Sequence, residues 1–397
     1  MTTVVGGVYH EVCIEPFWDD VYGSAGRAAA AISNAIPNVS LCTYQSRELS
    51  DGIQNLAAVY GLQICGETSS DEVRFEYVHS LADPRITPRP DAISQEKNLV
   101  VEDDVVLRFG MMEGTAEVHA KKAVYDPQSA FDPRPFAENG STAKSLALML
   151  NRLEGKRLTG ESDPMKMVDK IMADDDANVI VIKMGGHGAL VATRGSEPTI
   201  VPAYKSGNVW KLGSGDVFSA AFTLFWGVED RDPVEAAQLA SRATSYYCNS
   251  RALPIPSAEE LLALELVPVV PGNGRIYIAA PFFNLAERWI VEEVRNQLLH
   301  MGVEIFSPLH DVGVGPGEVV ASLDLKGLDE CDVVLAILNG SDAGTIFEIG
   351  YAVAKGVPVV ALAQNMRPED LKMPSGSGCV ILNDLVSAIY HAVWALP

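Results

Sequence analysis

The stretch CDVVLAILNGSDAGTIFEIGYAVAKGVPVV, from Cys331 to Val360, decides the fold of the C-terminal part of the chain. Its pattern is typical of a buried strand, a turn, a helix ended by a glycine, and a second strand. In chain order, these expected elements are Asp332–Leu338, Asn339–Gly344, Thr345–Lys355 with Gly356, and Val357–Ala361. They predict a parallel βαβ unit. Because ligands of such sheets bind at the carboxyl ends of the strands, Asp342 and Glu348 are expected at the binding edge.

The same alternation of strands and helices extends outward from this stretch. Short apolar runs rich in β-branched residues occur at Val179–Lys183, Arg275–Ala280 and Val333–Leu338, and helical patterns lie between them. This is the signature of an α/β protein with mostly parallel sheets. Two alternating runs, Val73–Val78 and Val105–Phe109, differ and predict an antiparallel segment or small β lid on the first domain.

A boundary is predicted at Leu266–Gly274, whose sequence LVPVVPGNG holds two prolines and two glycines. Breakers at this density usually mark a linker. We therefore expect a first domain at 1–265, a linker at 266–274 and a second domain at 275–397.

Composition narrows the possible partners. The 397 residues include 30 Lys and Arg against 52 Asp and Glu, a formal net charge of −22, which disfavours binding to nucleic-acid polymers. Neither a signal peptide nor an apolar run long enough to cross a bilayer is evident, so we expect a cytoplasmic protein without a membrane partner. The six cysteines form no CxxC pair, which favours buried, reduced thiols.

Glu348 is the strongest candidate for chemistry. It is expected in the first turn of a largely apolar helix, where the positive helix end would keep its carboxylate ionised. Such a carboxylate suits attack on an anomeric carbon with oxocarbenium character. The spacing from Thr345 to Glu348 also matches a capping box, in which the glutamate only satisfies a backbone N–H.

Three blocks in this region resemble the nucleoside 2-deoxyribosyltransferases. They are RIYIAAPFF (Arg275–Phe283), DLKGLDECD (Asp324–Asp332) and DAGTIFEIGYA (Asp342–Ala352), in the family's order. The resemblance implies a Rossmann-like or flavodoxin-like parallel-sheet domain that needs no cofactor.

The same resemblance implies roles for individual residues. Glu348 would be the nucleophile that forms a glycosyl-enzyme, and Tyr277 would orient its carboxylate. Asp324 and Asp342 would hold the nucleobase, and one of them would protonate it as it leaves. Without the resemblance, Tyr277 is an ordinary strand aromatic and the two aspartates are a cap and a turn residue.

Further substrate contacts are expected around these blocks, from Phe282, Gly344, Ser307 and Asp311. His310, in the same segment as Ser307, fits a loop or capping residue better. In the family, a neighbouring subunit often completes the site with an Asn near its C-terminus, so the resemblance implies a homo-oligomer. The ending YHAVWALP offers no match to that tail, which leaves open whether a second base or water is the acceptor.

The N-terminal domain contains VWKLGSGDVFSAAFTLFWG, from Val209 to Gly227. Gly213, Ser214 and Gly215 would open a helix whose free N–H groups bind the transferring phosphate. Asp216 would accept the proton of the attacking hydroxyl, unless it is only a helix cap. This stretch resembles the signature of the PfkB, or ribokinase-like, carbohydrate kinases, which implies ATP and Mg²⁺ as cofactors.

Other segments keep the order of that family. They are the first strand at Gly6–Val12, a sugar-binding turn with Gly23 and Gly26, an Asn-x-x-Glu motif at Asn151 and Glu154 for magnesium and phosphate, and a strand-turn-strand near the nucleotide with Gly186 and Gly188. Glu11 is the candidate for the substrate-binding acid of the first strand. We assign no metal-ligating residue to the chain itself.

One departure from the PfkB pattern divides the functional hypotheses. The polar Asp-Thr pair expected ahead of the glycine turn is replaced by Trp210 and Lys211. The first hypothesis is a bifunctional enzyme that cleaves or exchanges the base of (deoxy)nucleosides or nucleotides and phosphorylates a sugar or nucleoside. The second is a regulated effector, in which a silent kinase-like domain senses a ligand or partner and gates a nucleotide-degrading or dinucleotide-degrading domain. The third is a binding protein with both sites decayed, which the set of Glu348, Tyr277 and the two aspartates argues against.

Overall fold

The computed structural model describes residues 1–129, 132–174 and 176–397. Its internal contacts divide the chain into two compact units, Met1–Pro268 and Val269–Pro397. A short strand, β15 (Pro268–Val269), lies at the division, inside the stretch expected as a linker. Among the described residues, no helix is long and apolar enough to cross a membrane.

The first unit is built on a nine-stranded sheet with the order β13-β12-β11-β10-β9-β8-β1-β4-β5. Neighbours from β5 to β11 are parallel, and β12 and β13 are added antiparallel at one edge. The strands are β1 (Thr2–Val5), β4 (Ser40–Gln45), β5 (Gln63–Thr68), β8 (Leu99–Phe109), β9 (Ala116–Asp126), β10 (Thr142–Asn151), β11 (Val179–Lys183), β12 (Ala189–Thr193) and β13 (Thr199–Val201).

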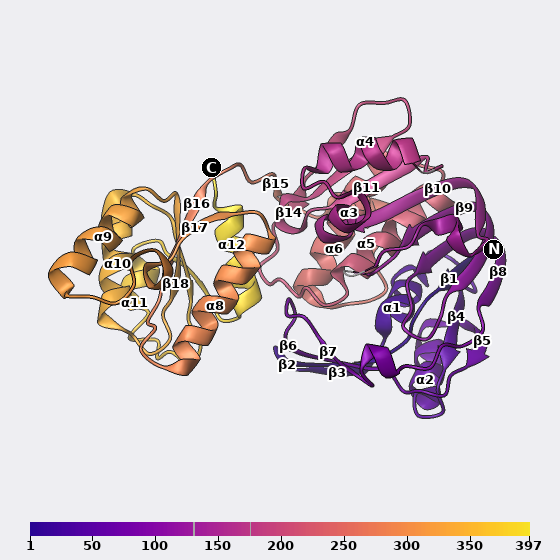
Figure 1. Cartoon of the computed structure of the whole chain (residues 1–397), viewed down its shortest axis with the longest axis horizontal. Coiled ribbons are helices and arrows are strands. Elements are labelled where there is room, and N and C mark those ends of the chain that lie inside the picture. Colours follow the sequence, from indigo (N-terminus) through magenta and orange to yellow (C-terminus); the bar gives the residue numbers. More distant parts are fainter. Residues whose placement is uncertain (130–131, 175) are drawn as a thin grey trace. The chain divides into compact units, whose positions relative to one another are not determined.

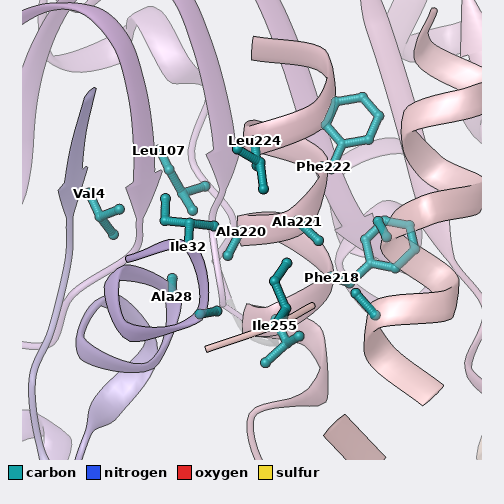
Figure 2. Close-up of a cluster of buried hydrophobic side chains, with 14 of the residues drawn as sticks. Val4, Ala28, Ile32, Leu107, Phe218, Ala220, Ala221, Phe222, Leu224 and Ile255 are labelled. Carbon is teal, nitrogen blue, oxygen red and sulfur yellow. The ribbon is translucent and has the colours of Figure 1, made fainter. Parts of the chain in front are cut away.

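Helices cover both faces of this sheet (Figure 1). Those described in the first unit are α1 (Gly23–Ile32), α2 (Ser50–Tyr60), α3 (Arg152–Thr159), α4 (Pro164–Asp174), α5 (Ser214–Phe222), α6 (Pro233–Ser250) and α7 (Ala258–Ala263). Alternate residues of each strand face opposite layers, so Val4 joins the core with α1, α2, α5 and α6, whereas Val5 joins the core with α4. Figure 2 shows the first of these cores, where Ala220 and Ala221 of α5 lie near Ile32 of α1.

A separate four-stranded sheet forms the predicted lid, in the order β3-β2-β6-β7. Its strands are β2 (His10–Glu15), β3 (Trp18–Val21), β6 (Arg74–His79) and β7 (Arg85–Thr87). The run Val73–Val78 therefore falls in the lid as expected.

Two expectations about the strands of this unit are wrong. The run Val105–Phe109 belongs to β8, which pairs in parallel with β1 and β9 in the large sheet. The first strand is Thr2–Val5, and Glu11 lies on lid strand β2. The first error arose because alternation within a run gives the faces of a strand and does not identify its neighbours. The second arose because the family resemblance placed the first strand one element too late in the chain.

The cysteines also differ from the prediction. Cys42 and Cys65 are directly paired neighbours on β4 and β5 and form a disulfide, with their Cα atoms 4.5 Å apart. Cys13, Cys248, Cys331 and Cys379 are free and buried, as expected for small apolar residues. Sequence spacing could not reveal the pair, because cross-strand register brings the two residues together.

The second unit contains a five-stranded parallel sheet with the order β17-β16-β18-β19-β20. Its strands are β16 (Arg275–Ala279), β17 (Glu304–Phe306), β18 (Val333–Ile337), β19 (Val359–Leu362) and β20 (Val380–Leu382), and its helices are α8 (Leu285–His300), α9 (Gly317–Asp329), α10 (Ala343–Lys355), α11 (Lys372–Gly376) and α12 (Leu385–Trp394). Numbered within this domain, the order is 2-1-3-4-5, that of flavodoxin-like folds.

Two apolar cores enclose this second sheet. One holds Val291 of α8 and Ile389 of α12, and the other holds Leu328 of α9 and Ile349 of α10. The helix that follows β16 and the helix that follows β18 therefore cover opposite faces. Since β16 and β18 are neighbours, their carboxyl ends form the topological switch point, where open α/β sheets bind ligands.

Candidate active site

The switch point of the second unit brings Tyr277 of β16 and Glu348 of α10 together. The Tyr277 hydroxyl donates a hydrogen bond to Glu348 Oε1 over 2.6 Å. Tyr277 is fully buried, and its ring stacks on Phe306 with centroids 5.4 Å apart and an interplanar angle of 11°. The ring is thus held by packing, and its hydroxyl fixes one oxygen of the carboxylate.

The electrostatics of Glu348 differ from the expectation of a carboxylate kept ionised by the helix end. The pKa of Glu348 is raised to about 7, chiefly by burial; the Tyr277 hydrogen bond opposes this rise, and the nearby charges of Asp324 and Asp342 contribute to it. Glu348 lies in the second turn of α10, because the helix begins at Ala343, and so it gains little from the helix end. The side chain is poised to exchange a proton near neutral pH.

The capping-box interpretation of Glu348 is wrong. Asp342 is the cap of α10, and its Oδ2 accepts from the Thr345 backbone N–H at 2.8 Å and from the Thr345 hydroxyl at 3.1 Å. Gly344, expected to contact substrate, is an exposed residue of the same first turn. Phe282, which follows β16, is half-buried against Phe283. Glu348 is therefore free of a structural role at its own helix start.

Asp324 is the second carboxyl group of this site. It lies on α9, and its Oδ1 is shielded from solvent without a hydrogen-bond partner among the described residues. Burial raises the pKa of Asp324, and its charge acts on both Tyr277 and Glu348. A shielded oxygen without a donor costs free energy, which a ligand donor or a bound proton would relieve.

The segment after β17 forms a local network. Ser307 is buried, its hydroxyl lies 2.9 Å from His310 Nδ1, and Asp311 Oδ2 accepts from the Ser307 N–H at 2.8 Å. His310 Nε2 lies 2.9 Å from Glu292 Oε1 of α8. Asp311 therefore closes a turn, and His310 links two elements. No local pattern indicated Glu292, because the contact joins residues 18 positions apart.

In the first unit, the start of α5 has the form expected of an anion site. Gly213 is its N-cap with φ +73°, and no side chain caps the helix. The Lys211 ammonium donates to the Ser214 hydroxyl at 2.6 Å, and burial lowers the pKa of Lys211. Trp210, by contrast, is buried under Arg251, whose guanidinium lies 4.0 Å from its ring centroid.

Asp216, in the first turn of α5, is already engaged by protein donors. Its Oδ2 accepts from Arg27 Nη1 at 3.0 Å, and its Oδ1 accepts from Gln128 Nε2 at 2.6 Å. Arg27 also forms a bidentate ion pair with Glu11, and Glu11, Arg27 and Asp216 are all buried. Glu11 and Asp216, predicted separately, are thus brought together by a residue that the sequence analysis did not select.

Asn151 and Glu154 form a reciprocal capping box at the start of α3. Burial raises the pKa of Glu154 to about 7, and the charge of Asp126 adds to the effect. Asp126 Oδ2 pairs with Lys183 at the end of β11, whereas its buried Oδ1 lacks a hydrogen-bond partner among the described residues.

Mg²⁺ is commonly held by one or two carboxylates together with phosphates, so Glu154 and Asp126 fit an ATP–magnesium group. The described residues contain no group of three His, Cys, Asp or Glu side chains that could hold a metal ion by themselves.

Three of the other predicted glycines, Gly23, Gly26 and Gly188, lie against close neighbours. Gly23 begins α1 beside the backbone of Gly7, and Gly26 packs on Leu56 of α2. Gly186 and Gly188 lie in the turn between β11 and β12. Gly188 has φ +80°, and a side chain there would overlap the carbonyl of Val201.

The first unit has a ribokinase-like α/β fold, and the second unit is similar to the nucleoside 2-deoxyribosyltransferases over much of its length. Residues 111–257 match the pfkB family of carbohydrate kinases, and residues 276–380 match the nucleoside 2-deoxyribosyltransferase family. Both resemblances inferred from the sequence, and their order, are therefore confirmed.

Individual relatives are similar to the first unit. A 5-dehydro-2-deoxygluconokinase of Listeria monocytogenes is 23% identical over 209 residues, which are 47% of this chain and 63% of that protein, so the match spans less than two thirds of that relative. Arabidopsis thaliana ribokinase complexed with ribose and ATP is 14% identical, with 66% of this chain and 97% of that chain covered and a TM-score of 0.50. A Vibrio cholerae fructokinase bound to fructose, ADP and potassium ion is 13% identical with the same coverage and a TM-score of 0.51. These two likenesses show the ribokinase-like fold.

Proposed function

We propose that the C-terminal domain cleaves or exchanges the N-glycosidic bond of (deoxy)nucleosides or nucleotides through a covalent glycosyl intermediate on Glu348. The observation that carries this proposal is the 2.6 Å hydrogen bond from the buried Tyr277 hydroxyl to Glu348, at the switch point of the sheet. A carboxylate so oriented can reach an anomeric carbon with its second oxygen.

The mechanism consists of two displacements at C1′. Glu348 attacks C1′ while the bond from C1′ to the base nitrogen breaks, and the base takes a proton from a neighbouring carboxyl group. Asp324 suits that proton transfer because burial raises its pKa, whereas Asp342 is engaged as a helix cap. A second base or water then attacks C1′ on the face opposite Glu348, the ester bond between C1′ and Glu348 breaks, and the acceptor's proton passes to the carboxylate that protonated the first base. The net result is retention.

A trapping experiment tests this assignment. Incubation with a 2-fluoro-2-deoxy nucleoside should add the mass of the sugar to the peptide that holds Glu348, because fluorine destabilises the oxocarbenium-like transition state through which the intermediate breaks down and so lets the intermediate accumulate. Glu348→Gln should abolish both trapping and base release. Glu304→Gln, the same change at an exposed residue near the amino end of β17, should change neither. Label on a different residue would assign the nucleophile elsewhere.

For the N-terminal domain, the sequence left two roles open, phosphate transfer from ATP to a sugar or nucleoside and silent ligand binding. We infer the second role, with ATP and Mg²⁺ as the ligands and the α5 start, Lys211 and the orphaned Asp126 Oδ1 as their contacts. Both oxygens of Asp216 already accept hydrogen bonds from protein side chains, which argues against a free general base. The domain would then regulate the glycosidic site, and ATP consumption that depends on a sugar and on Asp216 would refute this role.

A further inference from the structure

Arg27 links both acids predicted for the kinase-like site. It extends from α1 with a relative exposure of 1%, and its Nη1 lies 3.0 Å from Asp216 Oδ2 and 3.2 Å from Glu11 Oε1. A second nitrogen, Nη2, donates to the other oxygen of Glu11. The guanidinium therefore bridges the lid strand β2 and the start of α5.

The position of Arg27 is that required of a phosphate acceptor. A hydroxyl that attacks a phosphate at the α5 start must lie within hydrogen-bond reach of the base, about 2.6–3.2 Å. Arg27 Nη1 occupies the position beside Asp216 where the attacking hydroxyl would lie. The rest of the Arg27 side chain packs against Gly213, and a side chain at position 213 would overlap Arg27. The ring of Tyr22 lies 5.4 Å from the guanidinium carbon and encloses it further.

Charge keeps Arg27 in this place. The buried carboxylates of Glu11 and Asp216 both face the single guanidinium of Arg27. If the guanidinium moved away, two negative charges would remain unpaired in a region shielded from water. A sugar hydroxyl is neutral and cannot replace a cation there. Gln128 donates to the remaining oxygen of Asp216 and closes the other approach.

We propose that Arg27 fills the acceptor position of the kinase-like domain and so prevents phosphate transfer to sugar and nucleoside hydroxyls. This inference rests on the proposed silent role of the N-terminal domain and names the residue that causes it. The domain keeps its helix-start anion site, but the place of the second substrate is occupied by its own side chain.

The first test uses ATP with Mg²⁺ and measures ADP formation with water, ribose, fructose, myo-inositol or adenosine as acceptor. The wild type and Asp216→Asn should give the same background rate. The double variant Arg27→Gln/Glu11→Gln leaves Asp216 as the only charge of the three and admits a hydroxyl or water. Its ADP formation should rise at least about tenfold and fall back when Asp216→Asn is added.

In the phosphate transfer expected of this variant, the bond from the β–γ bridging oxygen to the γ-phosphorus breaks, the acceptor oxygen bonds to phosphorus, and the acceptor's proton passes to Asp216. Arg27→Lys keeps the positive charge and should remain silent.

A second test needs no nucleotide. Guanidinium chloride at low millimolar concentration should bind Arg27→Ala in the vacated position and raise its Tm by about 2–4 °C, but should leave the wild type unchanged. Sugar-dependent transfer by the wild type that requires Asp216 would overturn both this inference and the silent role. A silent wild type whose folded Arg27 variants gain neither transfer nor guanidinium binding would overturn only the inference about Arg27. Where the double variant fails to fold, the wild-type comparison with Asp216→Asn still tests the silent role, and guanidinium binding by Arg27→Ala still tests the place of Arg27.

Discussion

Replacing Tyr277 by phenylalanine removes a single oxygen atom, the one that donates to Glu348 Oε1 at 2.6 Å. Packing should survive, because the stacked contact with Phe306 involves only the rings. A hydrogen bond to a charged group contributes about 1.5–3 kcal/mol, which corresponds to about a 10- to 100-fold loss of base release at neutral pH. The same energy equals a rise of about 1–2 units in the pKa of Glu348.

The direction in which activity changes with pH follows from the ionisation of the nucleophile, Glu348. Attack requires the ionised carboxylate, so activity should rise with pH through the pKa of Glu348, which burial raises to about 7 in the wild type. Tyr277 opposes that rise, and its loss should shift the acidic limb of the profile to higher pH. The deficit should therefore shrink above about pH 9, where both forms are ionised.

The assay is kcat/KM for base release from 2′-deoxynucleosides, measured by chromatography from about pH 5 to about pH 10. Tyr351→Phe is the matched control. Tyr351 lies on α10, as Glu348 does, and its hydroxyl donates to Asp329 at 3.0 Å instead of to Glu348. An equal loss in both variants, or a Tyr277→Phe deficit that is the same at every pH, would refute the proposed hydrogen-bond role.

Three further predictions follow from the same contacts. Glu348→Gln should lower base release at least about 1000-fold. Because burial raises the pKa of Glu348 from 4.5 to about 7, the wild type loses stability as pH rises between those values, so this variant should gain about 3 kcal/mol in urea unfolding at about pH 8 and nothing near pH 4. Gly213→Ala, at φ +73° and against Arg27, should cost about 2–4 kcal/mol, whereas Gly61→Ala, at φ +65° in open space, should cost about 1 kcal/mol. Asp324→Asn should slow release of natural bases about 100-fold but scarcely affect a nitrophenyl 2-deoxyriboside, whose leaving group needs no proton; equal losses for both substrates would remove Asp324 from the acid role.

Much of the second unit could be predicted from local patterns. The spacing from Asp332 to Ala361 indicated the strand, helix and strand that the structure contains, and the blocks around Tyr277 and Glu348 indicated two residues that prove to be hydrogen-bonded across 71 positions. Glu348 was misplaced by one helical turn because Asp342 takes the cap, and its pKa was misjudged because burial depends on the whole fold.

The first unit shows where such patterns stop. The alternation of Val105–Phe109 was correct as a strand and wrong as a lid element, and Cys42 with Cys65 required a strand register that spacing does not encode.

The sequence by itself indicated the two domain types and their order through family motifs that lie within short stretches of chain, and the same motifs indicated the proposed residues Tyr277, Asp324 and Glu348. The tertiary structure alone decided how acids are paired and how deeply they are buried. Arg27 contacts Asp216 across 189 positions, and through that contact Asp216, the predicted catalytic base, is one partner of a buried ion pair. Charge and solvation depend on neighbours in space, and only the packed sheet and its helices bring those neighbours together.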